Sequence, residues 1–318
     1  MKIGRCAVFF VLTSMFVFAI ATVTQAELTL CTPINQMLVP YTISVPGNYC
    51  LTSDLTSSSP TGNVITINAS NVVLDLNDHR IGGQGAGLAT QAVGIYANQR
   101  KNVIVRNGVV RGFYCGIQLD DTSGNTSLGN VVEGIRADSN TARGIMVVGF
   151  GNRIRYNQVI NTGGTTVGTP DVYGIYSSGR AAVIRENIVG STNGSSGAAV
   201  FGIYSSGATS VIGANAVSAT REEAGETSYA IYLDALSADN MVDNNIMTNP
   251  ALGPGTSTGL SVNGSNAIAR DNTVFNMTYG LSFSGSSGIY KNNFAVGVTN
   301  PFTGGTPADP SVTNYHNP

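Results

Sequence analysis

Short apolar segments alternate with small and polar residues between positions 94 and 300, in a pattern that recurs eight times. Each unit begins with a glycine-isoleucine step or a close variant of it, followed by a run in which apolar and polar side chains alternate. The eight starts are Gly94, Gly116, Gly144, Gly174, Gly202, Ala230, Gly259 and Gly280. They lie 21 to 30 residues apart, and self-similarity at such a period is the sequence signature of a solenoid.

An asparagine forms a second anchor in most units. It stands 13 residues after five of the starts, at Asn107, Asn157, Asn187, Asn215 and Asn272. The eighth unit reaches Asn292-Asn293, the sixth reaches Asn245 after a two-residue insertion, and the second has Gly134-Ile135 instead. Asparagine tolerates the left-handed backbone region and its amide hydrogen-bonds locally. We therefore expect it at corners of the chain, where stacked amides would form a ladder along the solenoid axis.

The period within a unit is that of strands. Residues 174–189 contain short runs rich in β-branched side chains, bounded by glycine, serine and asparagine. No window in the repeats has a convincing 3.6-residue period. Three short strands joined by corners make one coil of a parallel β-helix. We predict about ten such coils, with neighbouring coils about 4.8 Å apart.

These units resemble the single-stranded right-handed parallel β-helices of the pectin-lyase-like superfamily. The shared phrase is "GI…I-x-x-N-x-V", and residues 41–51 and 73–81 look like the first coils of that family. The resemblance covers about residues 40–300. The right hand comes from the family, and it is also the usual hand of crossovers between parallel strands. Because the superfamily includes lyases, hydrolases, epimerases and adhesins, the resemblance implies a fold rather than a reaction.

The first 26 residues have the features of a secretory signal. Lys2 and Arg5 precede a mostly apolar run over 7–21, and Thr24-Gln25-Ala26 has the small residues of a cleavage site. The alternative is a membrane anchor, for which the apolar run is short. No later run is long and apolar enough to span a bilayer, so we expect a secreted or periplasmic protein.

The remaining chain is predicted to have three parts. Residues 27–62 form an N-terminal cap and first coil, residues 63–300 the parallel β-helix, and residues 301–318 a C-terminal cap or tail. Cys31 and Cys50 flank the first coil, and a disulfide between them would contribute about 3 kcal/mol. Two buried thiols are the alternative. We expect Cys115 to be a small buried hydrophobe.

Composition excludes some partners and cofactors. The chain has 318 residues, of which 39 are glycine and 11% are charged, and its formal net charge is −2. It has no basic excess to hold a phosphate backbone, so we expect no nucleic-acid partner. With two histidines and four cysteines, a dedicated transition-metal site is not expected either. Calcium would be needed only if the protein were a lyase like the pectate enzymes of the family.

The alternation on the first strand of each unit predicts which side chains face outward. The residue after the Gly-Ile step should point to solvent, which aligns Tyr96, Tyr176, Tyr204 and Tyr232 along the axis. Asp120 and Asp234 belong to the next outward column. One step before the glycine, we expect an inward aromatic stack. Its members are Tyr173, Phe201, Tyr229 and Tyr279. Lateral loops, such as 163–171 and 193–199, would wall a groove over this strand.

The outward column supports two interpretations. The tyrosines, with Asp120 and Asp234, are candidate carbohydrate-binding residues, because flat rings and hydroxyls suit sugars. Stacked aromatics also stabilise neighbouring strands by pairing alone. The first interpretation predicts a secreted protein that binds an extracellular polysaccharide or cell-surface glycan, with cleavage or modification left open. The second predicts a non-catalytic structural or adhesive surface protein.

No catalytic residue can be assigned. A glycosidase needs two carboxyl groups about 5–9 Å apart. Asp120 and Asp234 lie four coils apart, about 19 Å, which is too far. The densest titratable cluster, Asp75, Asp78 and His79, can be read as a site or as a polar turn. Arg155 and Arg185 recur in matching places, where they would either grip an acidic polysaccharide or form surface ion pairs.

Overall fold

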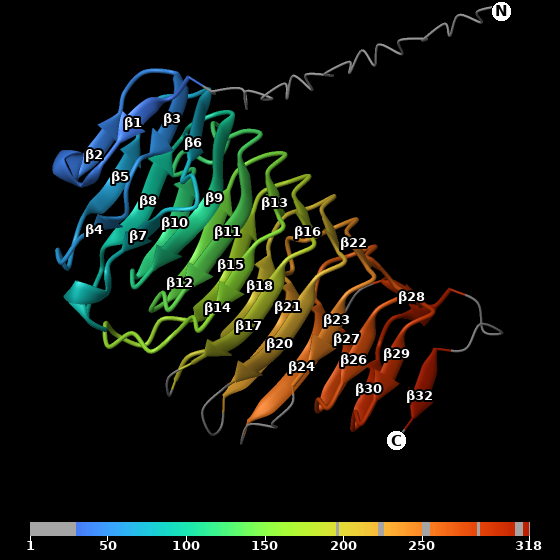
Figure 1. Ribbon diagram of the computed structural model, residues 1–318. Helices are drawn as coiled ribbons and strands as arrows, with labels where there is room; N and C mark the ends of the chain where they lie inside the picture. Colours follow the sequence, from blue (N-terminus) through green and yellow to red (C-terminus); the bar gives the residue numbers. More distant parts are fainter. Residues whose placement is uncertain are drawn as a thin grey trace, which may run out of the picture. The chain divides into compact units, whose positions relative to one another are not determined.

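The computed structural model describes residues 30–194, 197–221, 226–249, 255–284, 287–308 and 314–317. The predicted signal segment, residues 1–26, lies outside these residues. From Cys31 onward the chain forms one compact unit. Its strands are parallel and wind into a solenoid (Figure 1). The predicted all-β parallel β-helix is therefore confirmed.

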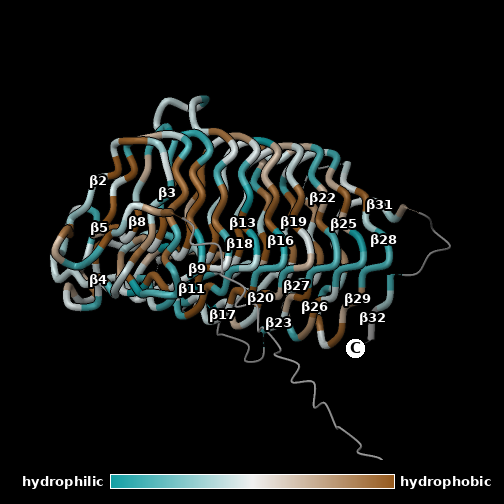
Figure 2. Tube along the Cα trace, turned by 45° about the horizontal axis from the view of Figure 1, so that its top comes forward, coloured by the Kyte–Doolittle hydropathy of each residue, from teal (hydrophilic) through white to brown (hydrophobic). Residues whose placement is uncertain are grey.

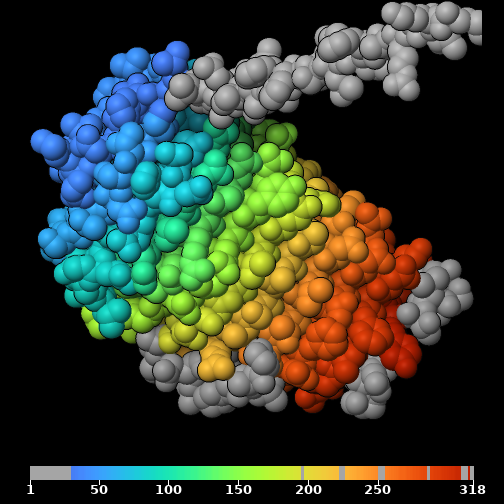
Figure 3. All heavy atoms as spheres, in the orientation of Figure 1, coloured from blue at the N-terminus to red at the C-terminus, as the bar shows by residue number. Residues whose placement is uncertain are grey.

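One face of the solenoid is an 11-stranded parallel sheet, here called the groove sheet. Its strands are β2 (Tyr41–Ile43), β5 (Asn63–Ile67), β8 (Val93–Asn98), β10 (Cys115–Asp120), β12 (Arg143–Val148), β15 (Val172–Ser178), β18 (Val200–Ser205), β21 (Thr227–Leu233), β24 (Thr256–Val262), β27 (Tyr279–Phe283) and β30 (Asn300–Thr303). Each strand comes from a different coil and pairs with those of the coils before and after it. On a space-filling view, successive coils form parallel bands across the surface (Figure 3).

The other strands belong to a 21-stranded sheet that bends around the rest of each coil. They are β1 (Thr32–Ile34), β3 (Gly47–Leu51), β4 (Leu55–Thr56), β6 (Val72–Asp75), β7 (Arg80–Gly82), β9 (Val103–Arg111), β11 (Val131–Asp138), β13 (Arg153–Arg155), β14 (Gln158–Ile160), β16 (Val183–Arg185), β17 (Ile188–Asn193), β19 (Val211–Gly213), β20 (Ala216–Arg221), β22 (Met241–Asp243), β23 (Ile246–Thr248), β25 (Ile268–Arg270), β26 (Thr273–Phe275), β28 (Ile289–Lys291), β29 (Phe294–Val296), β31 (Thr306–Pro307) and β32 (Tyr315–Asn317). Two short 3-10 helices span Gln36–Leu38 and Gln84–Ala86. From β12 onward, each coil contributes three short strands, as predicted.

The core consists of columns of aliphatic side chains stacked in register. The residue after each glycine start is fully buried and pairs with its counterpart on the next coil, as Ile145 does with Ile175 and Ile175 with Ile203. Apolar positions of successive coils consequently line up in rows along the trace (Figure 2). Each coil buries its apolar face only against its neighbours, which is why the repeat has to continue without slipping.

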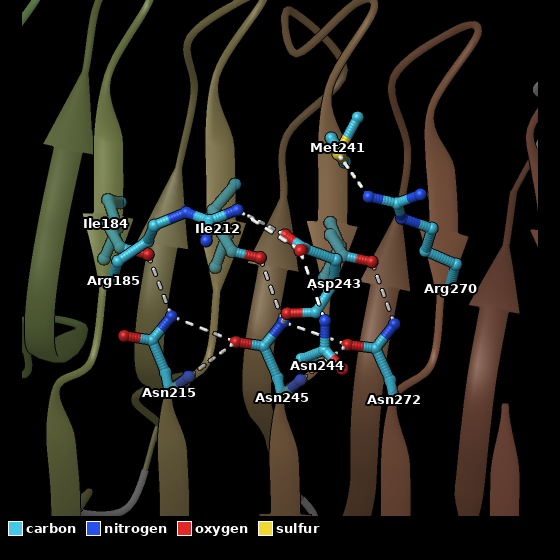
Figure 4. A network of polar contacts seen from close by, with 11 residues as sticks. Ile184, Arg185, Ile212, Asn215, Met241, Asp243, Asn244, Asn245, Arg270 and Asn272 are labelled. Atoms are coloured by element: carbon cyan, nitrogen blue, oxygen red, sulfur yellow. Dashed lines mark hydrogen bonds and ion pairs between the residues drawn. The ribbon is translucent and has the colours of Figure 1, made fainter.

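Buried asparagines form the predicted ladder. The side chain Nδ2 of Asn187 donates to Oδ1 of Asn215 at 3.0 Å, and Nδ2 of Asn215 donates to Oδ1 of Asn245 at 3.0 Å. From Asn157 to Asn293, each amide also donates to a backbone carbonyl of the preceding coil, as Asn215 does to Ile184 at 2.9 Å. The ladder members are Asn157, Asn187, Asn215, Asn245, Asn272, Asn293 and Asn314. Figure 4 shows three of them in line.

The ladder asparagines are not the left-handed residues, and this part of the prediction was wrong. From Asn157 to Asn293, positive φ belongs to the residue just before each ladder asparagine, such as Glu186 at 57° and Ala214 at 53°. Asn107, which the 13-residue spacing grouped with the ladder, occupies this preceding position, with φ 55°. Gly134, with φ 62°, occupies it in the next coil. The tight corner puts one residue into the left-handed region so that the following amide can point inward.

The coil continues beyond residue 300. Residues 301–318 were assigned to a cap or tail, but β30, β31 and β32 pair in register with β27, β28 and β29. Phe302 pairs with Leu281, and Asn314 accepts hydrogen bonds from Asn293. A phenylalanine replaces the leucine of the repeat there, so the sequence pattern fades while the geometry persists.

The cysteines lie as expected. Cys31 and Cys50 form a disulfide, with Cα atoms 5.7 Å apart. Cys115 is a buried free thiol, and its burial raises its pKa to about 12. A thiol held neutral in this way is a packing residue rather than a nucleophile.

The ladder should dominate the stability of the central coils. Replacing Asn215 with alanine removes four side-chain hydrogen bonds, one of which pairs the buried backbone N–H of Asn187. We expect Asn215→Ala to lower the free energy of unfolding by about 3 kcal/mol or more, measured by chemical denaturation. Asn193 is exposed and makes one such bond within the described residues, to Ser191, so Asn193→Ala is the matched control, with an expected loss below about 0.5 kcal/mol. Equal losses in the two variants would contradict this role of the ladder.

Candidate functional site

A groove with a volume of about 690 Å³ lies at the corner where the groove sheet ends and the chain turns into the next face. It runs along the solenoid axis over consecutive coils. Its lining residues are Asp121, Gly124, Asn125, Val148, Gly149, Phe150, Ser178, Gly179, Arg180, Ser206, Gly207, Ala208 and Leu236. The groove is therefore built from the corners that follow β10, β12, β15, β18 and β21.

The floor of the groove is bare backbone. Gly149, Gly179 and Gly207 occupy equivalent places on three consecutive coils. A Cβ atom on Gly179 would lie 2.2 Å from the carbonyl oxygen of Gly149, and one on Gly207 would lie 1.6 Å from that of Gly179. Only glycine lets the coils approach this closely. The floor thus carries no side chain at these three positions.

One end of the groove is a wall formed by residues 121–127. Asp121, only 6% exposed, organises this loop from inside. Its Oδ1 accepts from Ser123 Oγ at 3.2 Å and from the Gly124 N–H at 3.1 Å, while its Oδ2 accepts from the N–H groups of Thr126 and Ser127, each at 2.9 Å. Burial opposes the charged form, but these hydrogen bonds outweigh it and lower the pKa of Asp121. The Asp121 carboxylate therefore holds residues 123–127 in their conformation.

The opposite end is closed by the corner after β21. Leu236 stands at its tip and is 75% exposed. The Ser237 N–H donates to the carbonyl of Asp234 at 2.9 Å, and Ser237 Oγ donates to the carbonyl of Ser205 at 2.7 Å. These bonds fasten the corner to the preceding coil and leave the leucine side chain facing the groove.

Two side chains give the groove its chemical character. Phe150 is 50% exposed, and no other aromatic ring among the described residues stacks on it. Arg180 is exposed on the next coil, and no carboxylate in the described ranges lies within ion-pair distance of its guanidinium. The groove therefore offers an apolar ring and a planar set of hydrogen-bond donors side by side.

The predicted tyrosine column is aligned. The rings of Tyr176, Tyr204 and Tyr232 are stacked on consecutive coils, with centroids 5.0 and 5.5 Å apart. Because they stack face to face, each ring covers the face of its neighbour. The column consequently presents ring edges and hydroxyls rather than a flat surface for a sugar ring. Ser178 and Ser206, two residues after Tyr176 and Tyr204, line the groove, so the column borders the groove and does not lie under it.

The second aromatic row does not point inward, and that prediction was wrong. Tyr173, Phe201 and Tyr229 stack on one another at 5.0 and 5.3 Å. They also pack edge to face against the outer column, as Tyr173 does against Tyr176 at 5.1 Å. Tyr279 continues the row beyond Thr258. The strand departs from simple alternation at each glycine start, so both rows lie on the outer side.

The other candidate residues are spread along the groove sheet. Tyr96 lies on β8 and Asp120 on β10, where Asp120 accepts a hydrogen bond from Gln118 at 3.0 Å. Asp234 follows β21, four strands away, and accepts from the Tyr204 hydroxyl at 2.8 Å. Burial together with this bond raises the pKa of Tyr204. The structure thus brings Asp234 to the tyrosine column and keeps Asp120 apart from it.

The lateral loops predicted as walls do not line the groove within the described residues. Neither 163–171 nor the described part of 193–199 contributes to it. They enter the groove sheet at the start of its strands, whereas the groove follows the end of those strands. Its walls come from 121–127 and from the corner at Leu236.

The recurrent arginines form ion pairs. Arg155 pairs with Glu133 at 2.8 Å, and Arg185 reaches across a whole coil to Asp243 at 3.0 Å (Figure 4). Gly213 lies between the latter two, and a Cβ atom there would lie 2.5 Å from an Asp243 oxygen. The interpretation as a surface with ion pairs is the one that fits these contacts.

The cluster around His79 is also a structured turn. Asp75 forms an ion pair with Arg106 at 2.8 Å. The Asp54 carboxylate lies 3.2 Å from the Arg80 guanidinium and 3.5 Å from the His79 imidazole. In the described part of the chain, no group of three or more histidine, cysteine, aspartate or glutamate side chains could hold a metal ion. Nor is any described helix long and apolar enough to cross a membrane.

The chain matches no protein-family model and no curated protein. Among solved structures it is similar to the Dettilon tailspike protein, with a TM-score of 0.59 and 13% identity, over 90% of this chain and 60% of that one. The chain shares a parallel β-helix fold with this structure. A tailspike variant of E. coli bacteriophage HK620, in complex with a pentasaccharide, is similar to this β-helix with a TM-score of 0.52 and 13% identity, over 85% and 58% of the two chains.

These likenesses concern the fold alone. The present β-helix chain spans about 60% of the length of the Dettilon tailspike chain. Sequence reasoning missed Phe150, Arg180 and Leu236 because they lie in corners, where strand alternation gives no direction. One signal was in the sequence: the two-residue insertion before Asn245 falls in the corner that carries Leu236.

The Asp121 loop should depend on pH. Its folded pKa is depressed, so the stability that it contributes is present above the unfolded aspartate pKa, about 3.9, and is lost as the pH falls through the folded pKa. At pH 7, we expect Asp121→Asn to lower the free energy of unfolding by about 2 kcal/mol, and this difference from the parent should shrink as the pH falls below about 4. Chemical denaturation at the two pH values measures it.

The control is Asp78→Asn, at an exposed turn residue with φ 61°, which asparagine tolerates. We expect it to change stability by less than about 0.5 kcal/mol. A difference between Asp121→Asn and the parent that stayed constant with pH would contradict the assignment of the charge to this loop.

Proposed function

We propose that this protein binds an extracellular glycan in the groove at the end of the groove sheet. The observation that carries the proposal is the conjunction, in one groove of about 690 Å³, of a half-exposed phenylalanine, an arginine without a carboxylate partner in the described residues and a floor with three aligned glycines. Ligand sites are typically concave, with an apolar surface and a few placed polar groups.

Each part of the groove suits a part of a sugar. The Phe150 ring offers an apolar surface for the C–H face of a pyranose ring. The Arg180 guanidinium and the hydroxyls of Ser178 and Ser206 offer hydrogen bonds to sugar hydroxyls. Gly149, Gly179 and Gly207 place no side chain over the floor, so a sugar unit can lie close to the backbone of each coil. A ligand made of repeated units therefore matches a surface made of repeated units.

The tyrosine column supplies a second polar border. Tyr176, Tyr204 and Tyr232 present hydroxyls beside the groove, and Asp234 accepts from Tyr204. We propose that these residues contact the glycan through hydroxyls and ring edges. In the proposal, Tyr96 on β8 and Asp120 on β10 lie outside the groove and do not contact the bound segment.

The proposal is binding rather than cleavage. Hydrolysis by a carboxylate pair needs two acids across the scissile bond. Among the described lining residues Asp121 is the one carboxylate, and its oxygens already accept four hydrogen bonds. The Cys31–Cys50 disulfide supports an oxidising, extracellular or periplasmic location. The pentasaccharide in the similar HK620 tailspike structure is further support for a glycan ligand.

Binding is tested with a panel of acidic and neutral polysaccharides in affinity electrophoresis. We expect at least one polysaccharide to retard the protein. Phe150→Ala and Arg180→Ala should each weaken that retardation roughly tenfold, a loss of about 1.4 kcal/mol. Phe294→Ala and Arg155→Ala are the matched controls, because these residues lie on other faces and Arg155 is paired with Glu133.

Two outcomes would contradict the proposal. Retardation by no polysaccharide would favour the structural or adhesive alternative. Equal weakening by groove and control variants would place binding elsewhere on the molecule. Mixtures of the protein with each polysaccharide are also monitored for new unsaturated ends, which absorb in the ultraviolet. Their appearance would show that the protein cleaves the polysaccharide as well as binding it.

A further inference from the structure

The corners that build the groove differ in length, and the difference decides where the groove begins and ends. The three coils that contain Gly149, Gly179 and Gly207 are here called the floor coils. In each of them the corner has two residues between the last outward strand residue and the residue in the left-handed region, namely 149–150, 179–180 and 207–208. In the flanking coils this segment is longer, namely 121–128 on one side and 235–238 on the other. Both insertions rise beside the floor as walls.

The groove also stops where the second insertion stands. The coil after Leu236 again has a two-residue corner, 264–265, with a glycine at its start. A Cβ atom on Gly264 would lie 1.7 Å from the Ser237 carbonyl oxygen, so this corner continues the floor geometry. It nevertheless contributes no lining residue to the groove. The short corner alone does not extend the groove past the wall at Leu236.

The walls are held in place before any ligand arrives. Residues 123–127 are fixed from inside by Asp121, and Thr122 is joined to Asn98 of the preceding coil by an N–H to Oδ1 bond of 3.1 Å. The other wall is fastened through the Ser237 to Ser205 bond of 2.7 Å. A ligand therefore meets two preformed ends, and it need not order them at a cost in conformational entropy.

We propose that the groove selects a glycan segment of limited length, about four sugar units, instead of following a polymer indefinitely. This inference rests on the proposed function. The walls stand on β10 and β21, four strand spacings apart, which is about 19 Å at the usual spacing. The floor repeats at one strand spacing, about 4.8 Å, and its three corners together with the approach to one wall give four places for a sugar unit. One unit would thus lie over each floor corner, with a terminal unit against a wall.

This limit on ligand length, here called the length rule, should be visible in how the affinity depends on the number of sugar units. Each added unit meets another two-residue corner of the floor, so affinity should rise with each unit. Once the segment reaches both walls, a further unit has no equivalent corner to occupy. Affinity per oligosaccharide should then stop rising.

The test is a length series prepared from the polysaccharide that retards the protein in the panel. It is partly hydrolysed and fractionated from disaccharide to about octasaccharide, and each fraction is titrated calorimetrically. For the unmodified protein we expect several-fold gains per unit up to about four units and less than a twofold change beyond that. Gains that continue to the longest oligomer would overturn the length rule while leaving glycan binding intact. Failure of every fraction to bind would overturn the proposed function with it.

Two variants lower one wall. Deleting Ala235 and Leu236 gives this corner the length of the floor corners, and Leu236→Ala removes only the exposed side chain. Leu88→Ala, at another exposed leucine away from the groove, is the matched control. We expect both wall variants to move the plateau to longer oligomers and the control to leave it unchanged. A plateau that stays in place in Leu236→Ala, with its melting curve unchanged, would overturn the role of the wall.

Discussion

The structure depends on the hydrogen-bonded ladder of buried asparagine amides. Each ladder side chain from Asn157 to Asn293 donates to a carbonyl of the preceding coil and to the amide oxygen of the following coil, as Asn215 does with Ile184 and Asn245. A slip of one residue would leave several buried polar groups without partners, which costs far more than a surface contact can return. The ladder therefore fixes the register of every coil that it joins, and the aliphatic columns of the core follow from that register.

Fixed register has a consequence for function. When every coil rises by the same amount and is anchored at the same corner, differences between coils can appear only at the other corners. The groove is such a difference. Three short corners with Gly149, Gly179 and Gly207 lie between two longer ones, and the result is a floor with two walls. No pocket is needed in the packed interior.

Much of the fold could be predicted from sequence because the same pattern of apolar and polar residues occurs in eight units. The Gly-Ile starts gave the register of the groove sheet, the asparagines gave the ladder, and Cys31 and Cys50 gave the disulfide. The repeat could not assign the left-handed residue, which precedes the asparagine, because a spacing rule cannot separate two adjacent positions. The coil at Phe302 was missed because geometry persists there after the sequence pattern has faded.

The candidate site was predicted less well. The alignment of Tyr176, Tyr204 and Tyr232 is confirmed, but the direction of Tyr173 and its row was wrong, since strict alternation fails at the glycine starts. Phe150, Arg180 and Leu236 sit in corners, where no periodicity applies. The ion pair of Arg185 with Asp243 spans two coils over Gly213, a contact that nearest-neighbour reasoning does not contain.

The most direct test of the account is a crystal structure of the protein with an oligosaccharide from the polysaccharide that it binds. The account predicts sugar density over Gly149, Gly179 and Gly207, with one ring against Phe150 and the chain ending between residues 121–125 and Leu236. Density on the Arg155 and Arg185 face, or along the tyrosine column with the groove empty, would contradict it.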